Sequence, residues 1–234
     1  MSSTPAYYAR LAAAYVRGKL MQTPLPKEYQ PLFAQPLDAL SEDEMDSLMQ
    51  LGIAQGLRLH RFKRTMDLAR VRTVLGTLKG LQPRHLLDIG SGRGAFLWPL
   101  LDAFPDLPVT ALDLLEYRVA DMQAVHDGGI AQLTALKMDV TALAFANRSF
   151  DVVTMLEVLE HIPDTRKALA EVCRVAERAF VCSVPSKPDD NPEHIHLFDE
   201  PTLRVLLAEQ GALHINVSYV LNHRIVVARM PLSR

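Results

Sequence analysis

Cysteine is scarce in this chain of 234 residues, which contains only Cys173 and Cys182. The two residues do not form a C-x-x-C pair, so the sequence offers neither a cysteine metal site nor a disulfide framework. We interpret them as core thiols of a protein in a reducing compartment. Long apolar segments are also missing, because no run of about eighteen apolar residues occurs and the first residues lack a long apolar core. We therefore expect a cytoplasmic protein with no transmembrane segment.

An excess of one charge sign is likewise absent. The chain has 25 Lys and Arg against 27 Asp and Glu, a formal net charge of −2. Composition therefore gives no bulk electrostatic reason to expect a nucleic acid partner. One local exception is the basic segment Arg58–Arg64, which also contains His60, Arg61 and Lys63. A solvated helix face explains this segment, and so does contact with an anionic substrate, a phosphate or an acidic membrane surface.

Length and composition suit one α/β domain with an extension. Hydrophobic residues make up 49% and charged residues 22%, as in ordinary globular proteins. We expect residues 1–80 to form a helical extension and residues 81–234 to form the main domain. Within the extension, the residue spacing predicts a first helix over 5–20 and a third over 54–78. The capping-box pair Ser41 and Glu44 predicts that a second helix begins at about Glu42. Prolines interrupt the segment between the first two helices.

Strand-like and helix-like segments alternate from residue 84 onward, as a doubly wound, mostly parallel sheet requires. The strands are expected over 85–89, 109–113, 133–138, 151–155, 179–184, 213–219 and 223–228. The helices are expected over 95–104, 116–127, 165–176 and 200–210. A short turn near Asn222 joins the last two strands, which predicts a closing antiparallel hairpin.

Residues 86–96, LLDIGSGRGAF, carry more functional information than any other stretch. A short buried strand leads to Asp88 near its carboxyl end, and glycines then form a turn before a helix. Such a turn presents backbone N–H groups and the positive end of a helix to a ligand. Gly90-x-Gly92-x-x-Ala95 formally satisfies the dinucleotide-binding fingerprint, with alanine in the last place.

The stretch resembles more closely motif I of class I S-adenosylmethionine-dependent methyltransferases, D-x-G-x-G-x-G. Asp88, Gly90, Gly92 and Gly94 fill its positions. A carboxylate such as Asp88 suits the ammonium group of S-adenosylmethionine, and the loop amides suit its carboxylate. The resemblance also implies that Ser91 lies at the cofactor.

Further runs extend the resemblance over residues 85 to about 210. The run LAFANRSFDVV at 143–153 is similar to the family's L-P-F-x-D-x-S-F-D-V-V, and MLEVLEHIP follows at 155–163. The first run departs from the family at Ala144 and Asn147. The resemblance implies a seven-stranded, Rossmann-like methyltransferase fold and S-adenosylmethionine as cofactor.

Acidic residues at strand ends complete the expected cofactor site. Asp113 ends the second strand about twenty residues beyond the glycines, where an acid accepts hydrogen bonds from ribose hydroxyls in both NAD and S-adenosylmethionine sites. A helix cap is the alternative role for Asp113. The resemblance makes Asp139 the adenine contact and adds Leu114, Val140 and Glu157 to the cofactor site.

Two histidines are the expected catalytic residues. His161 follows Glu157 and Glu160 in E-V-L-E-H, where two carboxylates and an imidazole could ligate a divalent metal. This pattern resembles ubiquinone-pathway O-methyltransferases and small-RNA 3′-end methyltransferases that bind such an ion, although many relatives with E-x-L-E-H bind none. His196, with His194, lies in the loop after the fifth strand and could be a base, a fourth ligand or a structural residue.

We expect an enzyme that transfers a methyl group from S-adenosylmethionine to a small molecule at oxygen, with residues 1–80 capping the acceptor. The first alternative is an RNA 3′-end or tRNA methyltransferase whose Arg58–Arg64 segment meets phosphates. Overall acidity and the lack of an RNA-binding module argue against a nucleic acid substrate. The second alternative is a non-catalytic S-adenosylmethionine-binding subunit, and a dehydrogenase is the third. The sequence carries no signal for oligomeric state.

Overall fold

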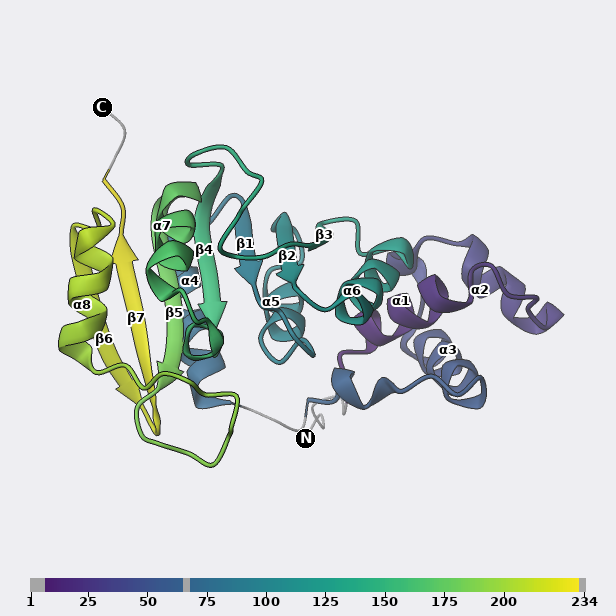
Figure 1. Cartoon of the computed structure of the whole chain (residues 1–234). Coiled ribbons are helices and arrows are strands. Elements are labelled where there is room, and N and C mark those ends of the chain that lie inside the picture. Colours follow the sequence, from purple (N-terminus) through teal and green to yellow (C-terminus); the bar gives the residue numbers. More distant parts are fainter. Residues whose placement is uncertain (1–6, 65–67, 232–234) are drawn as a thin grey trace.

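A seven-stranded sheet forms the centre of the protein (Figure 1). The computed structural model describes residues 7–64 and 68–231. The strand order is β3-β2-β1-β4-β5-β7-β6, with the first five strands parallel and β7 antiparallel to both of its neighbours. The strands are β1 Leu86–Ile89, β2 Val109–Asp113, β3 Leu133–Lys137, β4 Phe150–Leu156, β5 Ala176–Pro185, β6 His214–Val220 and β7 His223–Arg229. All seven predicted strands and the closing hairpin are confirmed.

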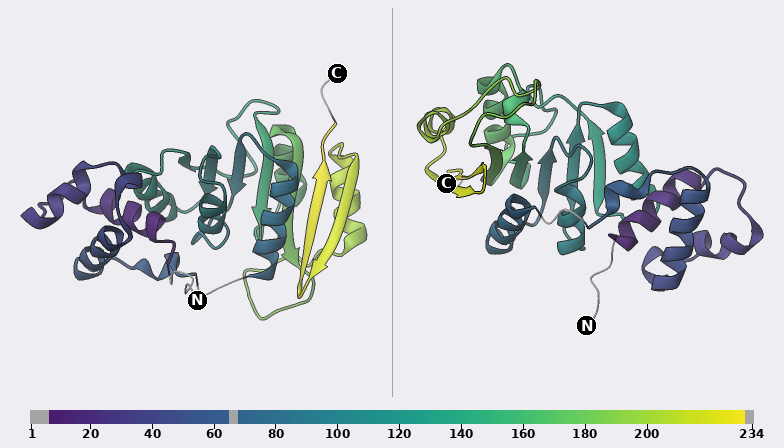
Figure 2. Two further views of the ribbon diagram at one scale, coloured as in Figure 1. Left: turned by 180° about the vertical axis from the view of Figure 1, so that it is seen from behind. Right: turned by 90° about the horizontal axis from the view of Figure 1, so that it is seen from below.

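Helices cover both faces of the sheet and create two hydrophobic cores. The helices are α4 Ala69–Leu81, α5 Leu97–Ala103, α6 Glu116–Asp127, α7 Thr165–Val175 and α8 Glu200–Glu209. One core contains side chains of α4, α5 and α6, including the buried Trp98. The other contains side chains of α7 and α8 together with Phe180 of β5. The reverse view in Figure 2 brings α4 in front of the sheet. Burial on both faces explains the nearly continuous apolar sequence of the central strands.

The N-terminal helices extend the molecule beyond the β3 edge of the sheet (Figure 1). They are α1 Ala9–Leu20, α2 Gln30–Ala34 and α3 Glu42–Ala54, and α3 begins with the predicted Ser41–Glu44 capping box. Helix α1 packs against α6 at very short range, because a Cβ on Gly18 would lie 1.9 Å from the Ala124 carbonyl oxygen. Among residues 7–64 and 68–231, no helix combines the length and the apolar character needed to cross a bilayer.

An ionic cluster at Asp121 of α6 joins the N-terminal helices to the main domain. Asp121 pairs with Lys19 at 3.0 Å and with Arg61, and it accepts a hydrogen bond from the Tyr15 hydroxyl at 3.2 Å. Burial raises the pKa of Tyr15 to about 12, and the Asp121 carboxylate adds to the effect. Arg64 pairs with Asp102 at 2.8 Å. Arg61 and Arg64 of the basic segment Arg58–Arg64 therefore stabilise the contact between the N-terminal segment and the main domain.

The predicted helix over 54–78 is confirmed only from Ala69 onward, where α4 lies, and its first part is wrong. Helix α3 ends at Ala54, and Gly56 follows in a left-handed conformation with φ of 79°, which favours glycine and stops a helix. The 3₁₀ turn Leu59–Phe62 comes next, and α4 begins only at Ala69. Met66, which contributed to the helical spacing in the sequence, lies outside the described residues.

Candidate cofactor and active site

The glycine loop after β1 folds back against the end of β2. The amides of Gly90 and Ser91 both donate to the Leu112 carbonyl, at 2.9 and 3.0 Å. Gly90, Gly92 and Gly94 have φ values of 70°, 58° and 83°, in the region that favours glycine. A Cβ on Gly90 would lie 2.4 Å from the Val158 side chain, so glycine is also required there by the close approach of a neighbouring loop.

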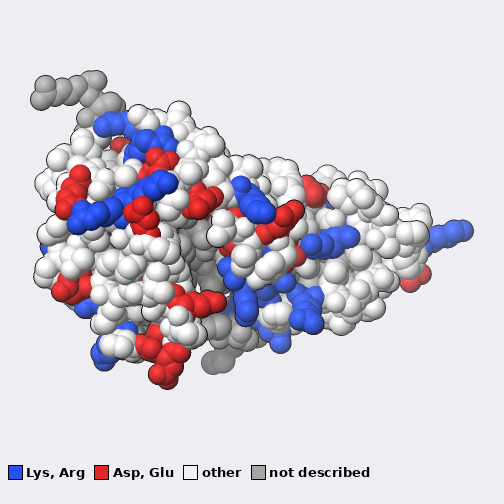
Figure 3. Space-filling view, in the orientation of Figure 1, with Lys and Arg blue, Asp and Glu red and all other residues white. Residues whose placement is uncertain are grey.

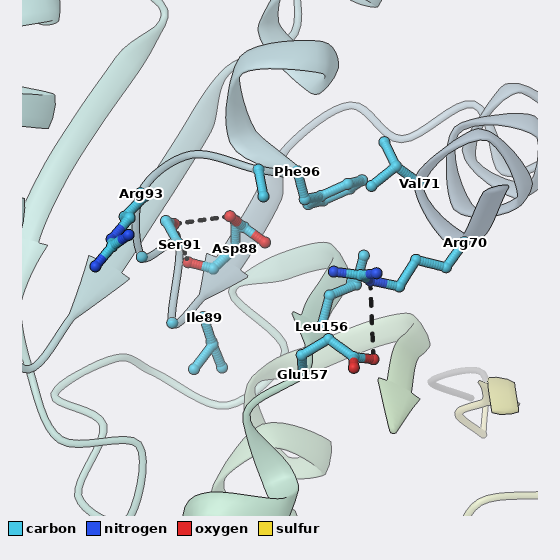
Figure 4. A pocket seen from close by; sticks show the side chains of 12 residues that line it. Arg70, Val71, Asp88, Ile89, Ser91, Arg93, Phe96, Leu156 and Glu157 are labelled. Atoms are coloured by element: carbon cyan, nitrogen blue, oxygen red, sulfur yellow. Dashed lines mark hydrogen bonds and ion pairs between the residues drawn. The ribbon is translucent and has the colours of Figure 1, made fainter. Parts of the chain in front are cut away.

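A small cavity of about 130 Å³ lies beside this loop, between β1 and helix α4 (Figure 4). Asp88 forms part of its wall and is only 2% exposed. Its carboxylate accepts hydrogen bonds from Ser91 Oγ at 2.7 Å and Thr154 Oγ1 at 2.8 Å. Burial nevertheless raises the pKa of Asp88 to about 6. A buried acid in this state favours a ligand that brings a positive charge.

Glu157 closes the other side of the small cavity. It follows β4 with φ of 54°, a conformation that costs energy for a residue other than glycine. Its Oε1 accepts a hydrogen bond from Ser183 Oγ at 2.6 Å, and its Oε2 lies 3.0 Å from His223 Nδ1. Arg70 of α4 approaches the same carboxylate at 4.0 Å, and Figure 4 shows its guanidinium above Glu157.

A larger cavity of about 810 Å³ lies beyond the ends of β2 and β3. Asp113 is 4% exposed and accepts the amides of Gly92 and Leu115, each at 2.9 Å. It thus holds the glycine loop and the residue before α6, but it does not cap that helix, whose N-cap residue Leu115 forms no side-chain cap. Asp139 uses Oδ1 to accept from the amide and hydroxyl of Thr141. Neither carboxylate has its full capacity of about four lone pairs occupied.

The two cavities share Ile89, Gly90, Gly92 and Glu157 in their walls, so one elongated ligand could occupy both. Nine of the ten predicted cofactor residues line one or both cavities: Asp88, Gly90, Ser91, Gly92, Asp113, Leu114, Asp139, Val140 and Glu157. The tenth, Gly94, lies in the turn, where its amide donates to the Ser91 carbonyl at 2.9 Å.

A buried acid and two histidines meet beside the larger cavity, whose wall includes one of the histidines, His161. Glu160, His161 and His194 offer ligand atoms that all lie within 4.8 Å of one another. Glu160 is 0% exposed, and within the described residues neither of its carboxylate oxygens has a hydrogen-bond partner. Burial raises the pKa of Glu160 to about 8, and the nearby Glu157 carboxylate adds to the effect. Glu160 is therefore either protonated or balanced by a cation.

Both histidines of this group are oriented through Nδ1. His161 Nδ1 lies 2.8 Å from the Glu193 carbonyl oxygen, and His194 Nδ1 lies 2.8 Å from Asp189 Oδ1. An oxygen acceptor at Nδ1 fixes the proton there and leaves the lone pair on Nε2. His194 Nε2 lies 4.0 Å from Glu160 Oε1. Outer acceptors that fix imidazoles in this way are typical of metal-binding histidines.

Of the predicted catalytic and metal-binding residues, His161 belongs to this group, whereas His196 and Glu157 lie outside it. His161 lines the larger cavity. The ring of His196 instead lies with Nε2 3.1 Å from the Ile162 carbonyl and packs against Phe198, so its catalytic role stays a prediction. Glu157, a predicted metal ligand, is held by Ser183 outside the group of three.

Sequence reasoning missed Arg70, Ser183 and His223. Arg70 precedes the recognisable motifs, Ser183 lies inside a strand, and His223 begins the closing hairpin. None of the three carries a local spacing signal.

Charge is unevenly distributed near the site. Figure 3 shows acidic side chains at the lower left and a group of basic side chains to their right. The loop after β5 contains the exposed acidic residues Asp189, Asp190 and Glu193. Within the basic segment, Arg58, His60 and Lys63 are exposed.

Comparison with known proteins identifies the domain. Residues 87–179 match the family profile described as a methyltransferase domain. The chain carries a methyltransferase domain. An O-methyltransferase of Pyrenophora dematioidea is 28% identical over 166 residues, covering 63% of this chain and 62% of the relative. The ubiquinone biosynthesis O-methyltransferase of Vibrio cholerae is 32% identical over 111 residues, covering 46% of this chain and 44% of the relative. The chain thus spans less than two thirds of either relative.

A solved structure supports the same fold. Magnesium protoporphyrin IX methyltransferase from Synechocystis PCC 6803, solved with bound SAH, aligns over 69% of this chain and 82% of its own, with a TM-score of 0.56 and 20% identity. The sheet order with its antiparallel end is the Rossmann-like fold of class I methyltransferases, as the sequence predicted. The methyltransferase family implies use of S-adenosylmethionine.

Proposed function

We propose that this protein methylates a small-molecule acceptor at oxygen with S-adenosylmethionine as donor. The observation that carries the proposal is the pair of joined cavities at the carboxyl ends of the parallel strands. Their common wall at Gly90 and Glu157 separates a small, acid-lined compartment from a larger compartment suited to a nucleoside. Ligands of open α/β sheets bind at this edge.

The residues present fit the two ends of S-adenosylmethionine. Asp88, with its raised pKa, would pair with the ammonium group, and Arg70 would pair with the carboxylate. In the larger cavity, Asp113 would accept from the ribose hydroxyls and Asp139 from the adenine amino group. Leu114 is 61% exposed there, and a stacked adenine would cover this apolar surface.

His161 is the proposed general base. When bound, S-adenosylmethionine supplies a methyl group on a positively charged sulfur that departs as a neutral thioether. The Nε2 lone pair of His161 can accept the proton of an acceptor hydroxyl as the new carbon–oxygen bond forms. The contact of Nδ1 with the Glu193 carbonyl keeps the ring in the required tautomer.

The same group of residues also fits a divalent cation. Glu160, His161 and His194 would hold it, and such an ion would lower the pKa of a bound hydroxyl. The unpartnered carboxylate of Glu160 supports this proposal, because a cation would satisfy both of its oxygens. In that case His161 would be a ligand of the ion and not the general base.

Titration calorimetry with S-adenosylmethionine, S-adenosylhomocysteine and NADH tests the cofactor. We expect heat with the first two compounds, whereas binding of NADH alone would overturn the proposal. A screen of phenols, catechols and carboxylic acids with labelled donor then tests the transfer. Chelator treatment separates the two forms of acceptor activation, because an unchanged rate would eliminate the cation.

An RNA substrate remains the principal alternative. The exposed Arg58, His60 and Lys63 favour it, whereas the pairing of Arg61 and Arg64 with acidic residues reduces the charge available for phosphates. RNA binding predicts an affinity that falls steeply with added salt. Cofactor binding without any methylated product across both acceptor classes would instead indicate a non-catalytic subunit.

A further inference from the structure

His223 lies between the two charged residues that close the small cavity. Its Nε2 is 3.4 Å from an Arg70 guanidinium nitrogen, and its Nδ1 is 3.0 Å from Glu157 Oε2. The direct approach of Arg70 to Glu157 is longer, at 4.0 Å. An imidazole from the closing hairpin thus contacts both members of a long ion pair between Arg70 and Glu157.

The contacts of His223 determine which ring nitrogen carries the proton. A guanidinium can only donate, so Nε2 of His223 must present its lone pair to Arg70. The proton then lies on Nδ1, which is 3.0 Å from Glu157 Oε2 but makes no hydrogen bond of good geometry to it. Ser183 donates to the other oxygen of Glu157 at 2.6 Å, so this carboxylate is held from two strands. In this tautomer His223 contacts both residues at once.

The position of His223 in the hairpin fixes its ring. It is the first residue of β7 and pairs with Pro185 at the carboxyl end of β5. The neighbouring Asn222 carbonyl accepts the Ser186 amide at 2.8 Å, and Arg224 donates to the Pro185 carbonyl at 3.3 Å. The ring is 23% exposed, so it is packed as well as held by its backbone.

We propose that His223 is a positioning residue for the amino-acid end of the donor, and that it keeps Arg70 available for the ligand's carboxylate. This inference rests on the proposed function. Without the imidazole, Arg70 can move closer to Glu157 and tighten the long ion pair into a hydrogen-bonded one, which uses the donors that the ligand needs. The closing hairpin then contributes to cofactor binding without itself reaching the nucleoside.

Two ligands test this role. S-adenosylhomocysteine carries the amino-acid tail, and 5′-methylthioadenosine has the same nucleoside without it. For His223→Ala we expect affinity for S-adenosylhomocysteine to fall about tenfold, as for loss of one charge-assisted contact, and affinity for 5′-methylthioadenosine to stay unchanged. His223→Gln restores an acceptor near the Nε2 position and should recover most of the loss. His214→Ala, at the exposed far end of the hairpin, is the matched control.

A double-mutant cycle with Arg70→Ala sharpens the test. We expect His223→Ala to add little to the effect of Arg70→Ala on S-adenosylhomocysteine binding, because both remove the same contact. If His223→Ala does not fold, His223→Asn keeps a donor towards Glu157 and still removes the Arg70 contact. Unchanged tail-dependent affinity, or equal losses for both ligands, would overturn the inference. Failure of the wild-type protein to bind S-adenosylhomocysteine would instead overturn the proposed function.

Discussion

Buried acids near the two ends of strand β4 have pKa values shifted in opposite directions. At its beginning, Asp151 accepts hydrogen bonds from the Arg84 backbone and guanidinium at 2.7 to 3.0 Å. These contacts lower the pKa of Asp151 to about 2. Just beyond the other end, Glu160 has no such partner among the described residues, and burial raises its pKa to about 8. Strand β1 ends similarly, with the raised pKa of Asp88.

This difference separates stability from binding. An acid whose pKa is lowered in the folded state stabilises the fold above its unfolded pKa, whereas an acid whose pKa is raised destabilises the fold at neutral pH. The amino ends of the strands therefore contribute to stability, and the carboxyl ends retain unbalanced acids that a positively charged ligand can neutralise. Four predictions test this contrast.

The largest expected effect is at the stabilising end. Asp151→Ala removes the buried acceptor of the Arg84 amide and guanidinium, and the loss of these charge-assisted hydrogen bonds should lower the free energy of unfolding by about 3 kcal/mol. In the wild-type protein, the contribution of Asp151 is present above pH 4 and is lost as the pH falls through about 2. Urea unfolding at pH 7 measures the change. S-adenosylhomocysteine affinity of the folded variant should not move, and a large loss would show that the two ends are not independent.

Asp88→Asn should do the reverse. We expect cofactor affinity to fall by about 2–3 kcal/mol, because the amide cannot pair with the ammonium group. The unliganded protein should become more stable at pH 7 by about 1–3 kcal/mol, since the cost of ionising a buried acid disappears. The wild-type contribution of Asp88 is fully present below pH 3.8 and is lost as the pH rises through about 6. Thermal melting and calorimetry measure the two effects, and a lower melting temperature would contradict the assignment.

Cation binding at Glu160 should depend on pH. Because the cation displaces a proton from a carboxyl with a pKa of about 8, affinity for Mn²⁺ should rise by up to about tenfold per pH unit towards pH 8. Glu160→Gln should remove the binding and, for the same reason as Asp88→Asn, make the unliganded fold more stable at pH 7. Calorimetry with Mn²⁺ alone provides the measurement. Equal Mn²⁺ affinity in the variant would eliminate Glu160 as a ligand.

Asp113→Asn should have the smallest effect. One amide oxygen still accepts the Gly92 or Leu115 amide, so we expect cofactor affinity to fall by about 1 kcal/mol. Asp106→Asn, in the connection between α5 and β2, is a suitable exposed control. Calorimetric affinity equal to that of the wild type would remove Asp113 from the cofactor site.

Local sequence patterns predicted helices and strands correctly where hydrophobic spacing was not contradicted by a helix-ending residue. The central strands could be predicted from their own residues, because a strand buried on both faces has a nearly continuous apolar sequence. The prediction for the segment after α3 was wrong because Leu59 and Phe62 have helical spacing although no α-helix forms there. Gly56 ends the helix, and Phe62 inserts between Tyr15 and Trp98. Spacing alone does not distinguish a helix from a buried 3₁₀ turn.

By itself, the sequence determined the sheet, the glycine turn and the acids at the strand ends, since each depends on neighbours in the chain. Tertiary structure alone decided which distant groups meet. Arg70 and His223 are separated by 153 positions, and no local rule relates them. His194 likewise reaches Glu160 only because the loop after β5 folds back, with the amides of Ile195 and His196 donating to the Glu160 carbonyl. Contacts of this kind depend on chain topology, which short-range periodicity does not encode.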